Sequence, residues 1–106
     1  MEPEERFAAL VDELAAEPGV IRPGADGGRG FGSAALKVNG SIFAMLTRER
    51  LVVKLPAARV AQLVAAGAGD PFDAGAGRPM RQWLTVGAEQ DWQALAREAL
   101  TFAGRR

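Results

Sequence analysis

The dipeptide Asn39-Gly40 constrains the fold of this chain more than any other feature of its sequence. It lies between two short runs, residues 34–38 and 41–47, that are rich in apolar residues. An Asn-Gly pair in this setting is typical of a type I′ turn, because both central residues of that turn need positive φ. The sequence therefore predicts an antiparallel β-hairpin at the centre of the fold.

A third strand is predicted at residues 51–55, after a turn at 48–50, so the hairpin extends into a three-stranded meander. Alternate residues of a strand point to opposite faces of the sheet. The residues predicted on the core face are Leu36, Val38, Ile42, Ala44, Leu46, Leu51, Val53 and Leu55. The residues predicted on the outer face are Lys37, Phe43, Met45, Val52 and Lys54. Because this outer face is half apolar, we expect a loop or a partner to cover it, or a ligand to bind it.

Helices are predicted before and after the meander along the sequence. Phe7, Leu10, Val11 and Leu14 have the spacing of one helical face and predict a helix over 3–16, and similar patterns predict helices over 56–67 and 91–103. A last strand is predicted at 80–86, after a connection at 68–77. The element order α-β-β-β-α-(β)-β-α, with a short strand in parentheses, predicts an α+β fold, a two-layer α/β sandwich with an antiparallel sheet.

Length and composition limit the domain organisation and the chemistry. A chain of 106 residues is one domain, 1–106, in which 1–30 form a helix and a glycine-rich connection and 31–103 form the core. The absence of cysteine and histidine excludes disulfides, thiolate or imidazole metal sites, and serine–histidine–acid triads. The alternating glycines of 28–32 lack the strand and helix that a dinucleotide fingerprint requires. Asp70 and Asp73 are interpreted as turn formers, so we expect no metal. We also expect no enzyme activity and no cofactor.

Charge is unevenly distributed although the formal net charge is zero. Residues 1–19 hold six acids against Arg6, whereas residues 20–60 hold seven basic residues against Asp26 and Glu49. This distribution predicts a local basic surface, or solvated charge on strands and turns. The acidic N-terminus has no apolar run of the length that a signal peptide or membrane helix needs, so we expect a cytoplasmic protein without a membrane partner.

The stretch GRPMRQW, residues 77–83, leads into the last predicted strand. Pro79 fixes φ ahead of the strand, and Trp83 is interpreted as an anchor within it. Arg78 has no such structural explanation, so it is predicted either to bond nearby carbonyls or Asp73, or to meet an external anion together with Arg81.

Three motifs together resemble the N-terminal domain of the TfoX/Sxy family in its short, stand-alone bacterial form. They are Phe31-Gly32, Asn39-Gly40 and the block from Gly77 to Trp83, and the resemblance covers roughly residues 30–103. The MmcQ/YjbR proteins are a more distant match. The resemblance implies a secretion-chaperone-like α+β fold and a link to regulation of competence or transcription. It implies no catalytic residues, and the second domain of the competence proteins has no counterpart in this sequence.

These observations favour a non-enzymatic regulatory or interaction module. Its candidate binding residues are Arg78, Arg81, Lys37, Lys54 and Phe43. The expected partner is a protein or a second copy of the chain, which would hide the apolar residues of the outer face. Nucleic acid is a further candidate partner, held mainly by phosphate contacts. The alternative is a domain that binds a small anionic ligand with the loop around Arg78.

Overall fold

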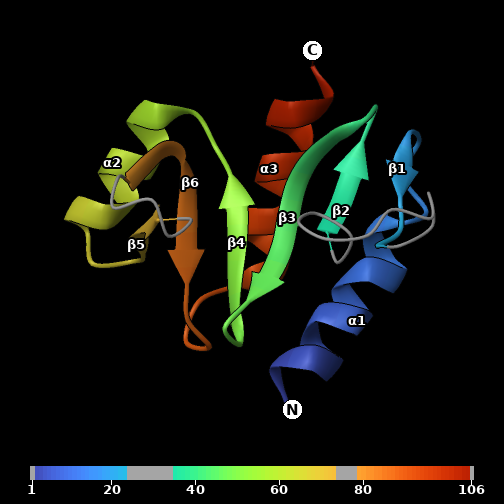
Figure 1. Ribbon diagram of the computed structural model, residues 1–106, viewed down its shortest axis with the longest axis horizontal. Coiled ribbons are helices and arrows are strands. Elements are labelled where there is room, and N and C mark those ends of the chain that lie inside the picture. The colour runs from blue at the N-terminus through green and yellow to red at the C-terminus, as the bar shows by residue number, and fades with distance from the viewer. Residues whose placement is uncertain (1, 24–34, 74–78, 106) are drawn as a thin grey trace.

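The structure, a computed structural model, describes residues 2–23, 35–73 and 79–105. Its elements run in the order α1 (Pro3–Leu14), β1 (Val20–Ile21), β2 (Ala35–Val38), β3 (Ser41–Thr47), β4 (Arg50–Lys54), α2 (Ala57–Ala65), β5 (Asp70–Asp73), β6 (Pro79–Val86) and α3 (Trp92–Gly104). Figure 1 shows helix α3 behind the strands β3 and β4, helix α1 below β2, and helix α2 beside β6.

The strands form one antiparallel sheet in the order β1-β2-β3-β4-β6-β5. The predicted α+β class is therefore confirmed, and the short strand expected before the last one is β5. The pattern of apolar residues in the sequence does not predict β1, a two-residue strand that pairs with the end of β2. None of the helices in the described part of the chain is long and apolar enough to cross a bilayer.

The Asn-Gly turn has the predicted conformation. Asn39 and Gly40 have φ of 51° and 86°, both positive as a type I′ turn requires. Val38 pairs with Ser41 directly across the turn. The turn therefore joins β2 to β3 as a two-residue hairpin, and this hairpin fixes the register of the centre of the sheet.

The main hydrophobic core lies between the sheet and the three helices. Side chains from each helix and from the central strands take part, among them Leu14, Leu51, Val60, Leu84 and Ala96. Leu14, Leu51, Leu84 and Ala96 have no exposed surface. Because this core lies on one side of the sheet, the opposite side is the outer face of the fold.

The predicted position of Phe43 on that outer face is wrong. Phe43 has no exposed surface and belongs to the main core, whereas Ile42 packs on the outer side. The cause is a β-bulge: Lys37 pairs with Ile42, but Leu36 pairs with Ala44, so Phe43 is an extra residue without a partner in β2. A bulge interrupts strict alternation, and here it turns both Phe43 and Ala44 toward the helices.

The apolar part of the outer face is buried within the chain. Ala35, Met45, Val52 and Phe72 form a second, smaller core cluster, with Ile42 and Trp83 packed against it. Val52 has no exposed surface and Met45 is 5% exposed. The chain itself therefore covers these residues of the outer face.

Arg6 links the first helix to the loop before the last one. Its guanidinium donates hydrogen bonds to the carbonyl oxygens of Ala88, at 2.7 Å, and Gln90, at 2.6 Å. The same group lies 4.3 Å from the centre of the Trp92 ring, and Trp92 Nε1 donates to the Gly87 carbonyl at 2.9 Å. This arrangement fixes α1 against the start of α3.

Candidate functional site

The turn between β3 and β4 has an unusual composition for its geometry. Thr47 pairs with Arg50 across a two-residue turn whose central residues, Arg48 and Glu49, have φ of 53° and 65°. Neither residue is glycine or asparagine, the types that adopt this left-handed conformation most readily. A left-handed residue with a Cβ costs about 1–2 kcal/mol. The chain therefore accepts a strained turn that carries Arg48 at its tip and Arg50 beside it.

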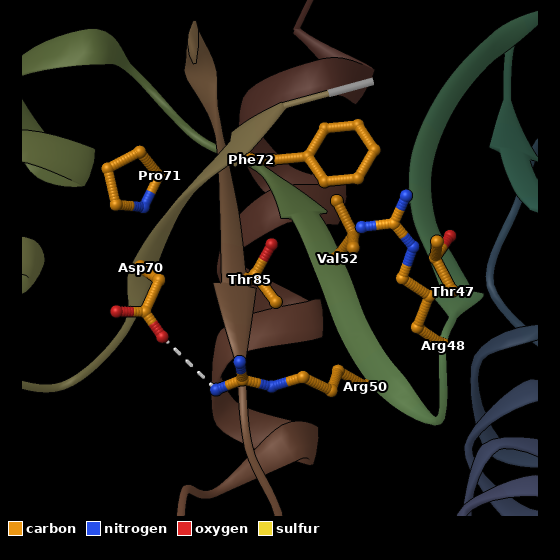
Figure 2. A pocket seen from close by; sticks show the side chains of 8 residues that line it. All are labelled: Thr47, Arg48, Arg50, Val52, Asp70, Pro71, Phe72 and Thr85. Atoms are coloured by element: carbon orange, nitrogen blue, oxygen red, sulfur yellow. Dashed lines mark hydrogen bonds and ion pairs between the residues drawn. The ribbon is translucent and has the colours of Figure 1, made fainter. Parts of the chain in front are cut away.

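This turn forms one wall of a pocket on the outer face. The pocket has a volume of about 240 Å³ and is lined by Thr47, Arg48, Arg50, Val52, Asp70, Pro71, Phe72 and Thr85. Its residues come from β3, β4, β5 and β6, which the sheet register brings together: Met45, Val52, Thr85 and Asp70 pair in one row across four strands. Figure 2 shows Val52, Thr85 and Phe72 between the two arginines and the β5 strand.

The two arginines of the pocket differ in their contacts. Arg50 donates to Asp70 Oδ2 from its Nη2 atom at 3.2 Å, and both side chains are exposed, 42% and 63% respectively. No hydrogen bond or ion pair of Arg48 occurs within the described ranges. In Figure 2 the guanidinium of Arg50 points toward Asp70, while that of Arg48 points away from it, toward Val52 and Phe72. One guanidinium is thus held by a weak exposed pair, and the other has its hydrogen-bond donors directed into the pocket.

Further basic residues lie on the same face of the sheet. Lys54 follows Val52 at the same parity, and its Nζ lies 5.9 Å from the centre of the Trp83 ring, at the outer edge of a cation–π contact. Lys37 shares its face with Ala35 and pairs with Ile42. The structure thus places Lys37 and Lys54, both predicted binding residues, on the outer face together with the arginine pocket.

The other predicted binding residues are Arg78, Arg81 and Phe43. Arg78 lies outside the described residues. Arg81 is exposed and lines a shallow apolar depression with Pro71 and helix α2, away from Arg48 and Arg50. Phe43 is buried in the main core, so it cannot contact a partner.

Sequence reasoning did not identify the pocket because its residues are distant in sequence. Thr47, Arg50 and Thr85 become neighbours only through the pairing of β4 with both β3 and β6. One local signal was present: a two-residue turn between strands at 48–49 must have positive φ, and arginine and glutamate are poor residues for it. A strained turn with a cation at its tip is a reason to examine that end of the sheet.

The helical side of the molecule holds its arginines in tighter pairs. Arg59 donates to Glu98 at 2.8 Å, and Arg97 to Glu13 at 2.8 Å. The hydrogen bond that Arg59 donates to Glu98 raises the pKa of Arg59, and those that Arg97 donates to Glu13 and then to Glu17 raise the pKa of Arg97. In the part of the chain that the structure describes, no group of three or more acidic side chains is arranged to hold a metal ion.

No family model, curated protein or solved structure matches this chain. The functional assignment is therefore argued from the outer face and its pocket.

Proposed function

We propose that this chain is a non-enzymatic interaction module that binds an acidic protein partner on the outer face of its sheet. The observation that carries the proposal is the concentration of positive charge there. Among the residues that the structure describes, Arg50 and Lys54 lie on the outer face and Arg48 on the adjoining turn, against Asp70 and the turn residue Glu49, and Lys37 lies on the same face. Helix α1, on the other side of the sheet, has Glu4, Glu5, Asp12 and Glu13 against Arg6.

This charge distribution favours particular partners. In a molecule of zero formal net charge, two opposite poles attract an acidic surface to one side and orient it during approach. A second copy of the chain, approaching face to face, would meet the same positive charge. The outer-face side chains Met45 and Val52 are already buried, so they offer no apolar surface that self-association would need to cover.

A protein partner fits the face better than nucleic acid does. Binding of unpaired bases uses exposed aromatic rings on which the bases stack. Phe43 is buried, and Trp83 is half-buried against the outer cluster beneath Lys54. A nucleic acid would still find phosphate contacts in Lys37, Lys54 and the arginines, so the experiment includes single-stranded DNA.

The resemblance to the TfoX N-terminal domain supports a regulatory role for this module. Such a role requires binding without chemistry. We therefore propose that the module regulates by contact with its partner. Competence or transcription is the regulated process that the resemblance indicates.

The proposal is tested by crosslinking and affinity capture from the native cell extract with three forms of the protein. Lys54→Glu reverses a charge at the centre of the outer face, and Arg105→Glu reverses an exposed charge at the end of α3. We expect Lys54→Glu to lose a specific partner that the wild type and Arg105→Glu both retain. The captured partner, once purified, should bind Lys54→Glu at least about tenfold more weakly, because a like charge then faces its acidic surface.

Two results would contradict this function. If Lys54→Glu and Arg105→Glu retain the same partners with equal affinity, the outer face is not the interface. If the wild type instead binds single-stranded DNA at physiological salt with a steep dependence on salt concentration, and Lys54→Glu does not, the partner is nucleic acid and the protein assignment is wrong.

A further inference from the structure

We propose that the pocket formed by Arg48, Arg50, Thr47 and Thr85 binds the phosphate group of a small molecule. This site shares Arg48 and Arg50 with the basic outer face proposed above, but it needs neither Lys54 nor Lys37. The pocket lies at the β3–β4 turn, and Val52, Pro71 and Phe72 line it together with the two arginines.

The donors of the pocket suit a tetrahedral oxyanion. A guanidinium offers two parallel N–H donors. Two guanidinium groups that approach from different sides match the several oxygens of a phosphate better than the two coplanar oxygens of one carboxylate. Arg48 and Arg50 both line the pocket; in Figure 2 the guanidinium of Arg48 lies beside Val52 and Phe72 and that of Arg50 beside Asp70, so a phosphate that contacts both needs Arg50 to turn from Asp70. The hydroxyls of Thr47 and Thr85 line the same space and supply two further donors.

The size of the pocket limits the rest of the ligand. Its volume of about 240 Å³ is below the range of roughly 300–1,000 Å³ that is usual for sites of drug-sized ligands. Apart from Asp70, the remaining lining residues are the apolar Val52, Pro71 and Phe72. The ligand is therefore a phosphate ester with a compact apolar body, and a nucleotide is too large to be enclosed.

Asp70 is an internal competitor for the ligand. Its carboxylate accepts one hydrogen bond from Arg50, at 3.2 Å, in a pair that is exposed on both sides. A phosphate that binds Arg50 must exchange with this carboxylate or accept its negative charge nearby, and either effect weakens binding. Removing the charge of Asp70 should therefore strengthen phosphate binding, which distinguishes this site from one that uses Asp70 to hold a cationic group.

The test is an NMR titration of the isotopically labelled full chain at physiological salt, with inorganic phosphate, phenyl phosphate and acetate as probes. We expect phosphate to shift the backbone amides from Thr47 to Arg50 and that of Thr85. Phenyl phosphate should bind several-fold more tightly because its ring covers Val52 and Phe72. Acetate should bind more weakly than phosphate.

Variants separate a built site from general attraction to positive charge. Arg48→Gln should weaken phosphate binding about tenfold or more, because a hydrogen bond to a charged group is lost together with the charge. Arg48→Lys, which keeps the charge but not the fork, should recover only part of the affinity. Asp70→Asn should strengthen binding several-fold, and Arg105→Gln, at the residue that follows α3, should leave it unchanged.

Several outcomes would overturn the proposal. Absence of shifts at Thr47–Arg50 would mean that the pocket binds no phosphate. Acetate binding as tightly as phosphate would assign a carboxylate site instead. Equal losses in Arg48→Gln and Arg105→Gln would indicate non-specific attraction, and weaker phosphate binding in Asp70→Asn would show that Asp70 is a contact and not a competitor. The protein partner is tested by Lys54→Glu, so the two proposals fail independently.

Discussion

Two hairpin turns of this chain have the same backbone conformation but different residues. Asn39-Gly40 suits a turn with two positive φ angles, whereas Arg48-Glu49 does not. The stability of β3 and β4 must offset the cost of the second turn, and both strands are central in the sheet. The structure thus retains Arg48 at a position where asparagine would be more stable, as is typical of residues kept for function.

Replacing Glu49 with glycine should stabilise the protein. Glu49 is exposed, its φ is 65°, and it does not line the pocket. Glycine removes the steric cost of the left-handed conformation, so we expect the free energy of unfolding to rise by about 1 kcal/mol. Urea denaturation measures this change.

A matched control exists in the first turn. Gly40 has φ of 86°, and a Cβ placed on it meets no atom within 4 Å. Gly40→Ala should therefore lower the free energy of unfolding by about 1 kcal/mol through backbone strain alone. If Glu49→Gly lowers stability instead, the cost assigned to the second turn is wrong.

At the scale of elements, contacts between segments distant in sequence hold α1 against α3 and the loop before it. Arg6 bonds with carbonyl groups more than eighty residues away and covers the ring of Trp92. Asp91 accepts a hydrogen bond from the Ala94 backbone amide at 3.0 Å and so caps the same helix, α3. The position of α1 therefore depends on Arg6, on the ion pair between Glu13 and Arg97, and on the apolar face that contains Phe7 and Leu10.

Arg6→Ala should destabilise the fold by about 2 kcal/mol, because two hydrogen bonds from a charged donor and one cation–π contact are lost together. Arg6→Lys should recover part of this loss, since an ammonium has the charge but cannot reach both carbonyls with a planar fork. The control is Arg22→Ala, which removes an ion pair with Asp12 whose side chains are 53% and 72% exposed. Surface pairs of this kind contribute about 0–1 kcal/mol. Thermal or urea unfolding of the three variants compares them, and equal effects of Arg6→Ala and Arg22→Ala would contradict the assigned role of Arg6.

The elements that could be predicted from the sequence are those with local signals. The Asn-Gly turn and the apolar spacing of Phe7, Leu10 and Leu14 each determine their structure within a few residues. The bulge at Phe43 has no such signal, because it arises from the pairing of β2 with β3. The pocket has no local signal either, because Thr47 on β3 and Thr85 on β6 come close only when both strands pair with β4.

At the scale of the whole molecule, the exposed surface gives little support for a stable dimer. In the described part of the chain, the large exposed hydrophobic side chains are Ile21, 36% exposed, and Met80, 39% exposed. They lie on β1 and β6, which three other strands separate in the sheet. The edge strands are also unsuited to pairing, because β1 has two residues and β5 contains Pro71.

We therefore expect the protein to be a monomer of 11.2 kDa in sedimentation equilibrium at physiological salt, even at high protein concentration. Stable dimers bury a contiguous interface of about 1,200–2,000 Å², and two isolated side chains at different places on the sheet do not provide one. Ile21→Ser and Met80→Ser should leave the measured mass unchanged. A dimer that Met80→Ser dissociates would instead place an interface on β6, next to Arg81, and a dimer that Ile21→Ser dissociates would place it at the β1 edge. Either result would make the partner a second copy of this chain, and the basic outer face would then lack the role proposed for it.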